Sequence, residues 1–282
     1  MSALYLIDGT FEIFRCFHAA PKVANTDGQE VGACRAFFHT MASLLREEDL
    51  THVAIAFDSV VSRVSRSDRS DSALIRSQFP IAANIARAFG MTVWPMSRFQ
   101  ADDALATGAF RWKEETCRVV ICSNDNDFAQ CVVGDRVILW NRIKKTRMNE
   151  RDVISKFGVR PAHIPEYLAM VGDPSDGLPG IPGFGPKATT ALINRYGHLE
   201  DILKSAGSWD VEVRGKEKLA DTLIDRGNEA LLYRNLSMLR TDVPLPERLE
   251  DLVWQGADRK KVEAVVETME DPSLHERTVR YR

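Results

Sequence analysis

Aspartates at four places in the sequence follow apolar runs, and this pattern is typical of a metal centre. They are Asp8, Asp58, the pair Asp102 and Asp103, and the pair Asp125 and Asp127. In an open α/β sheet the carboxyl ends of the strands face one crevice, so acidic residues at strand ends lie near one another. Carboxylates gathered there repel one another unless cations lie between them, and hard oxygen ligands suit Mg²⁺ or Mn²⁺. The four positions together therefore predict a shared site for divalent metal ions.

Each acidic position also has an ordinary structural interpretation. An aspartate in the position of Asp8 often caps the following helix. The pair Asp102-Asp103 would favour a helix N-terminus through the helix dipole. The run Asp125-Asn126-Asp127 has a composition common in turns, although its two carboxylates would point the same way if the preceding strand continues. We favour the metal centre because all four positions follow predicted strands.

Alternating strand-like and helix-like segments must position these residues. Continuous apolar runs rich in Val and Ile predict buried strands of a parallel sheet. Strands are predicted over 4–7, 53–57, 92–94, 118–122 and 137–140. Helices are predicted over 11–20, 31–47, 73–89 and 102–113. This order predicts the α/β class, with a doubly wound, mainly parallel central sheet flanked by helices.

The segment from Ser59 to Ser72 interrupts this alternation. It is rich in Ser, Arg and Asp, and Arg63, Arg66 and Arg69 follow one another at intervals of three residues. Such a composition fits either a mobile surface loop or a basic segment over the crevice, where the arginines would contact nucleic-acid phosphates. The residues alone leave both interpretations open.

A Gly- and Pro-rich segment between two predicted helices, 161–171 and 187–196, is the strongest single motif. Its closely spaced glycines let a phosphate approach backbone N–H groups at the start of the second helix, where a lysine neutralises the charge. An ordinary helix connection would not explain that lysine or the two aspartates upstream. We therefore predict a grip on the duplex backbone that reads no bases. The predicted contacts are Gly183, Gly185, Lys187 and Thr189.

Bulk composition is that of a globular protein and excludes several classes. Of the 282 residues 44% are hydrophobic and 27% charged, and the net charge is −3. Contacts to nucleic acid must therefore be local, and metal ions must offset the acidic crevice. The five cysteines form no Cys-x-x-Cys pair, and the six histidines are scattered and expected to be structural or exposed. With no long apolar run and no secretory leader expected, the sequence predicts a cytoplasmic monomer.

In order and spacing, these motifs resemble those of the 5′ nuclease family. The family comprises the 5′→3′ exonuclease domains of bacterial DNA polymerases and their stand-alone flap endonuclease relatives. The resemblance spans Leu6 to about Val243, and its landmarks are 6–10, 56–58, 101–103, 123–127 and 172–189. The last landmark is similar to the family's helix–three-turn–helix, which binds duplex DNA and often K⁺ through backbone carbonyls.

The resemblance implies a PIN-like fold and a metal-dependent reaction. It implies that two or more Mg²⁺ or Mn²⁺ ions are surrounded by Asp8, Asp58, Asp102, Asp103, Asp125, Asp127, Asp173 and Asp176. The implied chemistry is two-metal phosphodiester hydrolysis, in which one ion activates a water and the other stabilises the leaving 3′ oxygen. The protein then supplies no nucleophile, in agreement with the lack of a Ser/His or Cys/His pair.

Three positions depart from the family pattern. Gln100 stands where the family has Glu, so it could ligate a metal through its carbonyl oxygen but brings no negative charge. Asn126 stands where the family has Lys, so a cation near the scissile phosphate is expected to be missing. The segment Ser59–Ser72 is shorter than the family's arch and lacks its Tyr-Lys pair. These departures bear on the rate of catalysis and on threading of a 5′ end, and leave the fold and duplex binding untouched.

The resemblance also implies a domain division. Residues 1–160 form the nuclease domain, 161–245 the duplex-binding domain and 246–282 a C-terminal helical extension. Further helices are predicted over 216–239 and 259–269.

The predicted function is that of a structure-specific 5′ nuclease, an exonuclease or flap endonuclease, acting on flapped, nicked or 5′-ended DNA in replication or repair. The alternative is a DNA-binding protein of the same fold with weak or lost hydrolysis, which the three departures favour and the eight aspartates oppose. A haloacid-dehalogenase-type phosphatase is excluded because Thr10 stands where its second Asp is needed. A small PIN-type ribonuclease would not need the Gly183–Lys187 motif. The sequence identifies no polymerase or clamp partner.

Overall fold

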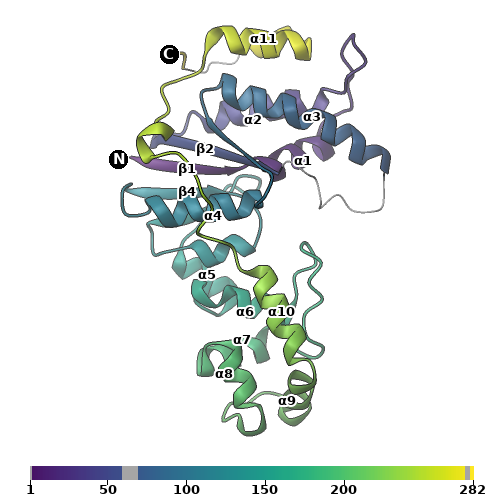
Figure 1. Cartoon of the computed structure of the whole chain (residues 1–282), viewed down its shortest axis with the longest axis vertical. Helices are drawn as coiled ribbons and strands as arrows, with labels where there is room; N and C mark the ends of the chain where they lie inside the picture. Colours follow the sequence, from purple (N-terminus) through teal and green to yellow (C-terminus); the bar gives the residue numbers. More distant parts are fainter. Residues whose placement is uncertain (1, 59–68, 277–279) are drawn as a thin grey trace. The chain divides into compact units, whose positions relative to one another are not determined.

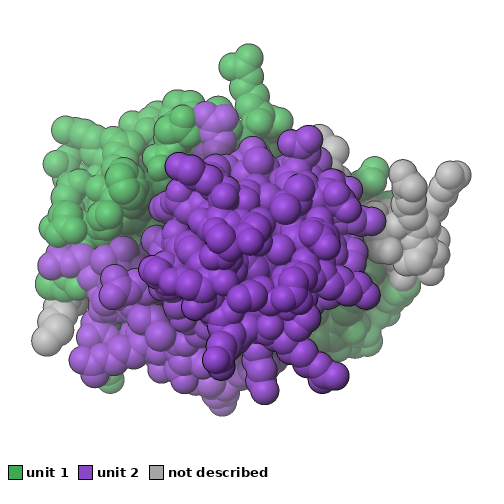
Figure 2. Space-filling view, turned by 90° about the horizontal axis from the view of Figure 1, so that it is seen from below, with its two compact units in different colours: residues 1–124, 140–142, 241–282 green, residues 125–139, 143–240 purple. Residues whose placement is uncertain are grey.

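The computed structural model describes residues 2–58, 69–276 and 280–282 (Figure 1). The chain divides into two compact units, coloured separately in Figure 2. Unit 1 contains residues 1–124, 140–142 and 241–282, and unit 2 contains residues 125–139 and 143–240. The predicted domain boundaries at residues 160 and 245 were drawn from sequence motifs, whereas these units are defined by compactness. The predicted boundaries therefore stay a prediction.

A mostly parallel sheet forms the centre of the fold, as predicted. Its strands are β1 (Ala3–Asp8), β2 (Leu50–Asp58), β3 (Thr92–Met96), β4 (Arg118–Cys122), β5 (Val137–Asn141) and β6 (Thr146–Met148). The strand order is β3-β2-β1-β4-β5-β6. β1 pairs in parallel with β2 and β4, and β2 pairs in parallel with β3. Every residue of β1 is buried, which explains its uninterrupted apolar sequence before the terminal aspartate.

The strand register places two of the predicted aspartates at the same edge of the sheet. Asp8 is the partner of Ala56 and ends β1, while Asp58 ends β2 beside Met96 of β3. Because the strands are parallel, both carboxylates leave the sheet at its carboxyl edge, where ligands of open α/β sheets bind.

Helices cover both faces of the sheet in unit 1. They are α1 (Gly9–Ala19), α2 (Gly32–Leu44), α3 (Arg69–Ala88), α4 (Ala101–Trp112) and α11 (Arg259–Met269). In Figure 1, α2, α3 and α11 lie on one side of the strands and α4 on the other. The predicted loop over Ser59–Ser72 is corrected in part, because α3 begins at Arg69. Arg63 and Arg66 lie outside the described residues.

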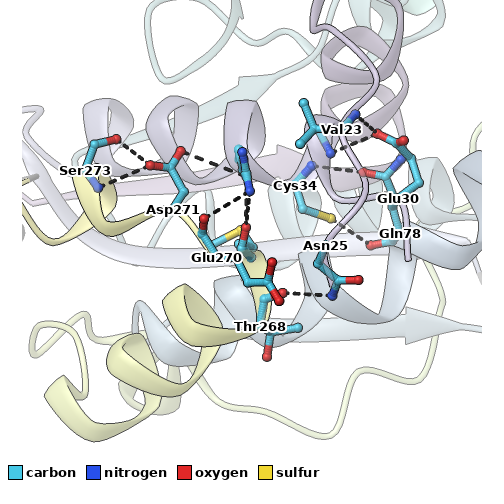
Figure 3. A network of polar contacts seen from close by, with 12 residues as sticks. Val23, Asn25, Glu30, Cys34, Gln78, Thr268, Glu270, Asp271 and Ser273 are labelled. Carbon is cyan, nitrogen blue, oxygen red and sulfur yellow. Dashed lines mark hydrogen bonds and ion pairs between the residues drawn. The ribbon is translucent and has the colours of Figure 1, made fainter. Parts of the chain in front are cut away.

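Polar contacts tie the C-terminal segment to the first helices of unit 1 (Figure 3). The Asn25 Nδ2 donates to the Thr268 carbonyl at 3.1 Å, and the Arg35 Nε donates to the Met269 carbonyl at 2.9 Å. Nearby, the Cys34 backbone N–H donates to the Gln78 Oε1 at 3.1 Å and joins α2 to α3. The C-terminal residues 241–282 therefore belong to the same unit as the strands near the N-terminus.

Unit 2 is built mainly of helices. They are α5 (Glu150–Phe157), α6 (Ile164–Val171), α7 (Pro186–Tyr196), α8 (Leu199–Lys204), α9 (Lys216–Asp225) and α10 (Gly227–Ser237). The range 216–239, predicted as helical, forms two helices, because the chain leaves helical geometry at Arg226 and α10 starts at Gly227. A Cβ at Gly227 would lie 3.0 Å from the Leu203 Cδ2, so glycine allows α10 to pack closely on α8. Over the described ranges, no helix combines the length and apolar character needed to cross a membrane.

Candidate metal and DNA-binding sites

Asp8 is buried at the end of β1 and accepts two hydrogen bonds. Its Oδ1 accepts from the Phe11 N–H at 2.8 Å, so it is the N-cap of α1. Its Oδ2 accepts from the Ser123 hydroxyl at 2.9 Å, just beyond β4. The side chain is 5% exposed. The ordinary interpretation as a helix cap is therefore correct for Asp8, and the second bond fixes its carboxylate toward the end of β4.

Asp58 holds the starts of two helices at the edge of the sheet. Its Oδ2 accepts from the Thr10 hydroxyl at 3.0 Å, in the first turn of α1. Its Oδ1 accepts from the Ala101 N–H at 2.8 Å, at the first residue of α4. Since both oxygens already accept hydrogen bonds, this geometry assigns Asp58 a positioning role.

The remaining predicted residues of unit 1 lie in the first turn of α4. Gln100 is the N-cap residue, is exposed, and its N–H donates to the Asp103 Oδ2 at 3.2 Å. Asp102 is 7% exposed. The helix dipole stabilises both carboxylates at this terminus. Asp102 and Asp103 therefore lie where the helix dipole favours their charges, as one of the two interpretations expects. Their role in binding a metal stays a prediction.

Unit 2 brings three of the predicted aspartates into one group. Oxygens of Asp125, Asp127 and Asp176 lie within 4.8 Å of one another. The condition that the preceding strand continues through Asp125 and Asp127 is not met, because β4 ends at Cys122. A turn aligns them instead: the Asp127 N–H donates to the Asp125 Oδ1 at 3.0 Å, and a 3₁₀ helix starts at Asp127.

Asp127 lies in an environment that disfavours its charge unless a cation is bound. It is 5% exposed, and its Oδ1 is buried with no hydrogen-bond partner among the described residues. Burial, followed by the charges of Asp125, Asp176 and Asp173, raises the pKa of the Asp127 carboxyl to about 8. A group of hard oxygen donors with an unsatisfied buried member fits a divalent cation. Within unit 1, no comparable group of three occurs among the described residues.

Asp173 links the acidic group to a lysine that the motifs did not single out. Its Oδ2 accepts from the Asn126 Nδ2 at 3.3 Å, and the Asn126 Oδ1 accepts from the Lys156 Nζ at 2.8 Å. Lys156 lies in the last turn of α5. Burial, followed by the charge of Lys144, lowers the pKa of Lys156. A cation from α5 therefore lies beside Asn126.

The Gly- and Pro-rich segment folds into a tight hairpin between α6 and α7. Asp173 and Leu178 pair as an antiparallel bridge, and the Ile181 N–H donates to the Met170 carbonyl at 2.8 Å. Gly180 has a φ of +72°, and a Cβ there would lie 2.6 Å from the Val171 backbone carbonyl. Only glycine combines that backbone conformation with such close approach.

The start of α7 has no side-chain cap, and its predicted contact with a phosphate stays a prediction. Gly185 is the N-cap, no side chain caps this terminus, and a Cβ at Gly185 would meet nothing within 4 Å. Lys187 is exposed in the first turn, which holds no acidic residue. Thr189 is 0% exposed, so its predicted contact with DNA does not fit the structure. Of the predicted arginines, Arg69 is the first residue of α3.

Comparison with protein families decides the classification. The family description "5′-3′ exonuclease, N-terminal resolvase-like domain" matches residues 3–158, and "5′-3′ exonuclease, C-terminal SAM fold" matches residues 159–260. The chain belongs to the 5′-3′ exonuclease family. The resemblance stated from the motifs is confirmed, and so is the combination of a mostly parallel α/β domain with a helical domain.

Curated relatives of this 5′-3′ exonuclease family member include DNA polymerases and a stand-alone protein. DNA polymerase I of Mycobacterium leprae is 35% identical over 97% of the chain, which covers 31% of that relative. DNA polymerase I of Rhizobium leguminosarum is 34% identical over 97% of the chain and 28% of its own length. The chain thus spans about a third of these polymerases. A 5′-3′ exonuclease of Aquifex aeolicus is 28% identical, with 97% of the chain and 94% of the relative covered.

Solved structures share the fold at low identity. T5 5′-exonuclease, in a structure with divalent metal ions (zinc) bound, has a TM-score of 0.66 and 17% identity, covering 97% of this chain and 96% of its own. The catalytic core of Rad2 in complex with DNA substrate has a TM-score of 0.62 and 13% identity, covering 98% and 90%. These similarities show the fold.

Proposed function

We propose that this chain is a metal-dependent, structure-specific 5′ nuclease that hydrolyses phosphodiester bonds of DNA at flaps, nicks or 5′ ends, as an exonuclease or flap endonuclease. The observation that supports it most is the group of Asp125, Asp127 and Asp176, with its buried and unsatisfied Asp127 oxygen. Family membership agrees with this reaction. Cleavage of a 5′-flap duplex with Mg²⁺, Mn²⁺ or EDTA tests the proposal.

Two sets of carboxylates are proposed to hold Mg²⁺ or Mn²⁺. In unit 2 the set is Asp125, Asp127 and Asp176, and Asp173 accepts hydrogen bonds beside it. In unit 1 the predicted ligands are Asp8, Asp102 and Asp103, with Gln100 at the start of α4, although no group of three as close as that of unit 2 occurs among the described residues there. Bound ions of this kind activate water and stabilise the leaving oxygen of a phosphodiester. That both sets act on one phosphodiester stays a prediction.

The chain's own residues have separate roles in this proposal. Asp58 holds the first turns of α1 and α4, so it orients the carboxylates of unit 1. Lys156 and Asn126 orient Asp173 and place one positive charge beside the acidic group. Asn126 therefore no longer argues for the non-catalytic alternative, and no observation on the described residues favours that alternative.

The start of α7 is proposed to hold the duplex by a backbone phosphate. Free N–H groups at the helix N-terminus, the open space at Gly185 and the exposed Lys187 suit an anion. Gly183 lies in the same turn with a φ of +87°. Such contacts give affinity without base specificity. A K⁺ ion held by backbone carbonyls of this hairpin remains part of the prediction.

Substitution of Lys187 by Ala should weaken duplex binding about equally for all DNA sequences. One lost phosphate contact should reduce the slope of log affinity against log salt by about 0.9. The measurement is a fluorescence-anisotropy titration at several salt concentrations. Lys204→Ala, an exposed lysine of α8 in the same unit, is the matched control and should leave the slope unchanged. An unchanged slope for Lys187→Ala would remove the hairpin from the DNA interface.

Gln100→Glu should lower the Mg²⁺ concentration that gives half-maximal cleavage. The added negative charge at the start of α4 attracts a divalent ion near Asp102 and Asp103, although exposure of residue 100 reduces the effect to about two- to fivefold. A metal titration of flap cleavage measures it. Gln255→Glu makes the same charge change at an exposed position elsewhere in unit 1. Equal midpoints for Gln100→Glu and Gln255→Glu would place residue 100 away from the ions.

A further inference from the structure

Three residues of unit 2 outside the acidic group come together where α6 and α8 begin. His163 precedes α6, Glu166 lies in its first turn, and His198 is the N-cap residue of α8. One ligand atom from each lies within 4.8 Å of the others. The His198 Nδ1 is 2.9 Å from the Glu166 Oε1, and the two imidazole ring centroids are 5.2 Å apart. The sequence does not indicate this group, because the first and last members are separated by the whole hairpin.

Two atoms of this group are buried and have no hydrogen-bond partner in the part of the chain that the structure describes. They are the Glu166 Oε2 and the His163 Nδ1. The Glu166 residue is 3% exposed, so its carboxylate lies away from bulk water. An unsatisfied buried polar atom destabilises the folded state, and more so when it is charged. A buried carboxylate with one unsatisfied oxygen, beside a ring nitrogen that is also unsatisfied, is stabilised by an additional electropositive partner.

An ion pair between Glu166 and His198 explains only part of this arrangement. A protonated His198 donates from its Nδ1 to the Glu166 Oε1, at the observed 2.9 Å. The pair leaves the Oε2 and the His163 Nδ1 unsatisfied. A cation held by one ligand atom from each of the three side chains would join all of them in one site.

We propose that His163, Glu166 and His198 form a Zn²⁺ site that joins the start of α6 to the start of α8. Two imidazoles and one carboxylate form a common three-ligand set for zinc, and nitrogen donors favour Zn²⁺ over Mg²⁺. Zinc bond lengths of about 2.0–2.1 Å and tetrahedral angles place ligand atoms about 3.3 Å apart, so the 2.9 Å hydrogen-bonded pair must open by a few tenths of an ångström on binding. The side chain of His198 is 62% exposed, so ions enter from solvent and a water takes the fourth position.

The local backbone supports this convergence. α7 ends at Gly197, whose φ of +80° turns the chain so that His198 follows immediately at the next helix. A Cβ on Gly197 would lie 3.8 Å from the His163 Cε1, so the turn runs beside that ring. A zinc ion there fixes the ends of α6 and α7 that lie opposite the Gly- and Pro-rich hairpin. We infer that it stabilises unit 2, independently of whether the chain hydrolyses DNA.

Calorimetric titration of the full-length chain with Zn²⁺ tests the site. The protein is first treated with EDTA and then kept in excess Mg²⁺, which occupies the oxygen-donor carboxylates and competes poorly for imidazole. We expect one Zn²⁺ per chain. His198→Gln should weaken binding by about tenfold or more, since loss of even an outer partner costs about 10- to 100-fold. His275→Gln, at an exposed histidine of unit 1, should leave binding unchanged.

A rescue variant and a stability measurement separate ligation from folding. His198→Cys keeps a zinc ligand and should restore much of the affinity lost in His198→Gln. Zn²⁺ at about a hundred times its Kd should raise the thermal midpoint of the unsubstituted protein by roughly 5 °C. It should not raise that of His198→Gln. Absence of Zn²⁺ binding, or equal binding by His198→Gln and His275→Gln, would overturn the site, and neither result bears on flap cleavage.

Discussion

Asp127→Asn should reduce metal-dependent flap cleavage by about 10²- to 10³-fold, the loss seen when one electrostatic stabiliser of a transition state is removed. Its carboxylate is buried in the group with Asp125 and Asp176, and its Oδ1 has no protein partner among the described residues. An amide keeps the shape and removes the charge that attracts the ion. Duplex affinity should stay within about twofold, because the proposed phosphate contact is at the start of α7.

The same substitution should stabilise the metal-free protein, which a merely structural residue would not do. Burial and three neighbouring carboxylates raise the pKa of Asp127 to about 8, so its charged form is disfavoured in the folded chain. At pH 8.5 in EDTA, thermal unfolding of Asp127→Asn should occur at a higher temperature than that of the unsubstituted protein. Asp221→Asn, at an exposed aspartate of α9, is the control for both measurements. Full cleavage by Asp127→Asn would remove this residue from the metal site.

Glu12→Gln should lower the free energy of unfolding by about 3 kcal/mol, because it breaks a buried ion-pair network. Glu12 is 1% exposed, and its Oε1 accepts from the Arg142 Nη1 at 2.8 Å. Its Oε2 accepts from the Arg15 Nε at 3.1 Å. The substitution leaves two guanidinium groups facing a neutral amide, and the side chain of Arg142 is 11% exposed. Asp8 is the N-cap of α1, the helix that contains Glu12. The network around Glu12 therefore also helps to hold the helix that Asp8 caps.

Urea denaturation measures this loss, with Glu48→Gln as the control. Glu48 is exposed in the same unit, and its substitution should change stability by less than about 0.5 kcal/mol. A loss of less than about 1 kcal/mol for Glu12→Gln would contradict the prediction. It would mean that Arg15 and Arg142 find other hydrogen-bond partners, and that the ion pairs with Glu12 add little to the free energy of unfolding.

Sequence patterns predicted the strands and helices whose burial is visible in their own apolar residues. The runs over 4–7 and 118–122 are apolar because both faces of their strands are covered, so composition alone indicated parallel strands. The helix over Arg259–Met269 was predicted with its observed bounds. The break at Arg226 between α9 and α10 was not predicted.

The helix α5 could have been found from its caps. Asn149 and Asp152 form a capping box, and Gly158 ends the helix with a φ of +75°. Such a signal is visible in a sequence without any tertiary information. Finding this helix would have drawn attention to Lys156 in its last turn.

The sequence predicted which residues belong to the acidic group of unit 2 better than it predicted how they are arranged. The aspartate motif indicated Asp125 and Asp127, but a turn and not a continued strand aligns them. The partnership of Asn126 with Lys156 joins residues 30 positions apart and depends on how α5 packs, which no local pattern encodes. The burial of Thr189 likewise follows from the packing of α7. Residue types predicted the chemistry, and tertiary structure determined which side chains meet.

A 5′-flap cleavage assay with EDTA-treated protein tests the central proposal most directly. We expect cleavage to appear on addition of Mg²⁺ or Mn²⁺, to be absent in EDTA and to be reduced about 10²-fold or more in Asp127→Asn. Duplex binding measured in parallel shows that the protein used is folded and competent. Duplex binding without cleavage at any concentration of either ion would contradict the account and assign the chain to the non-catalytic alternative.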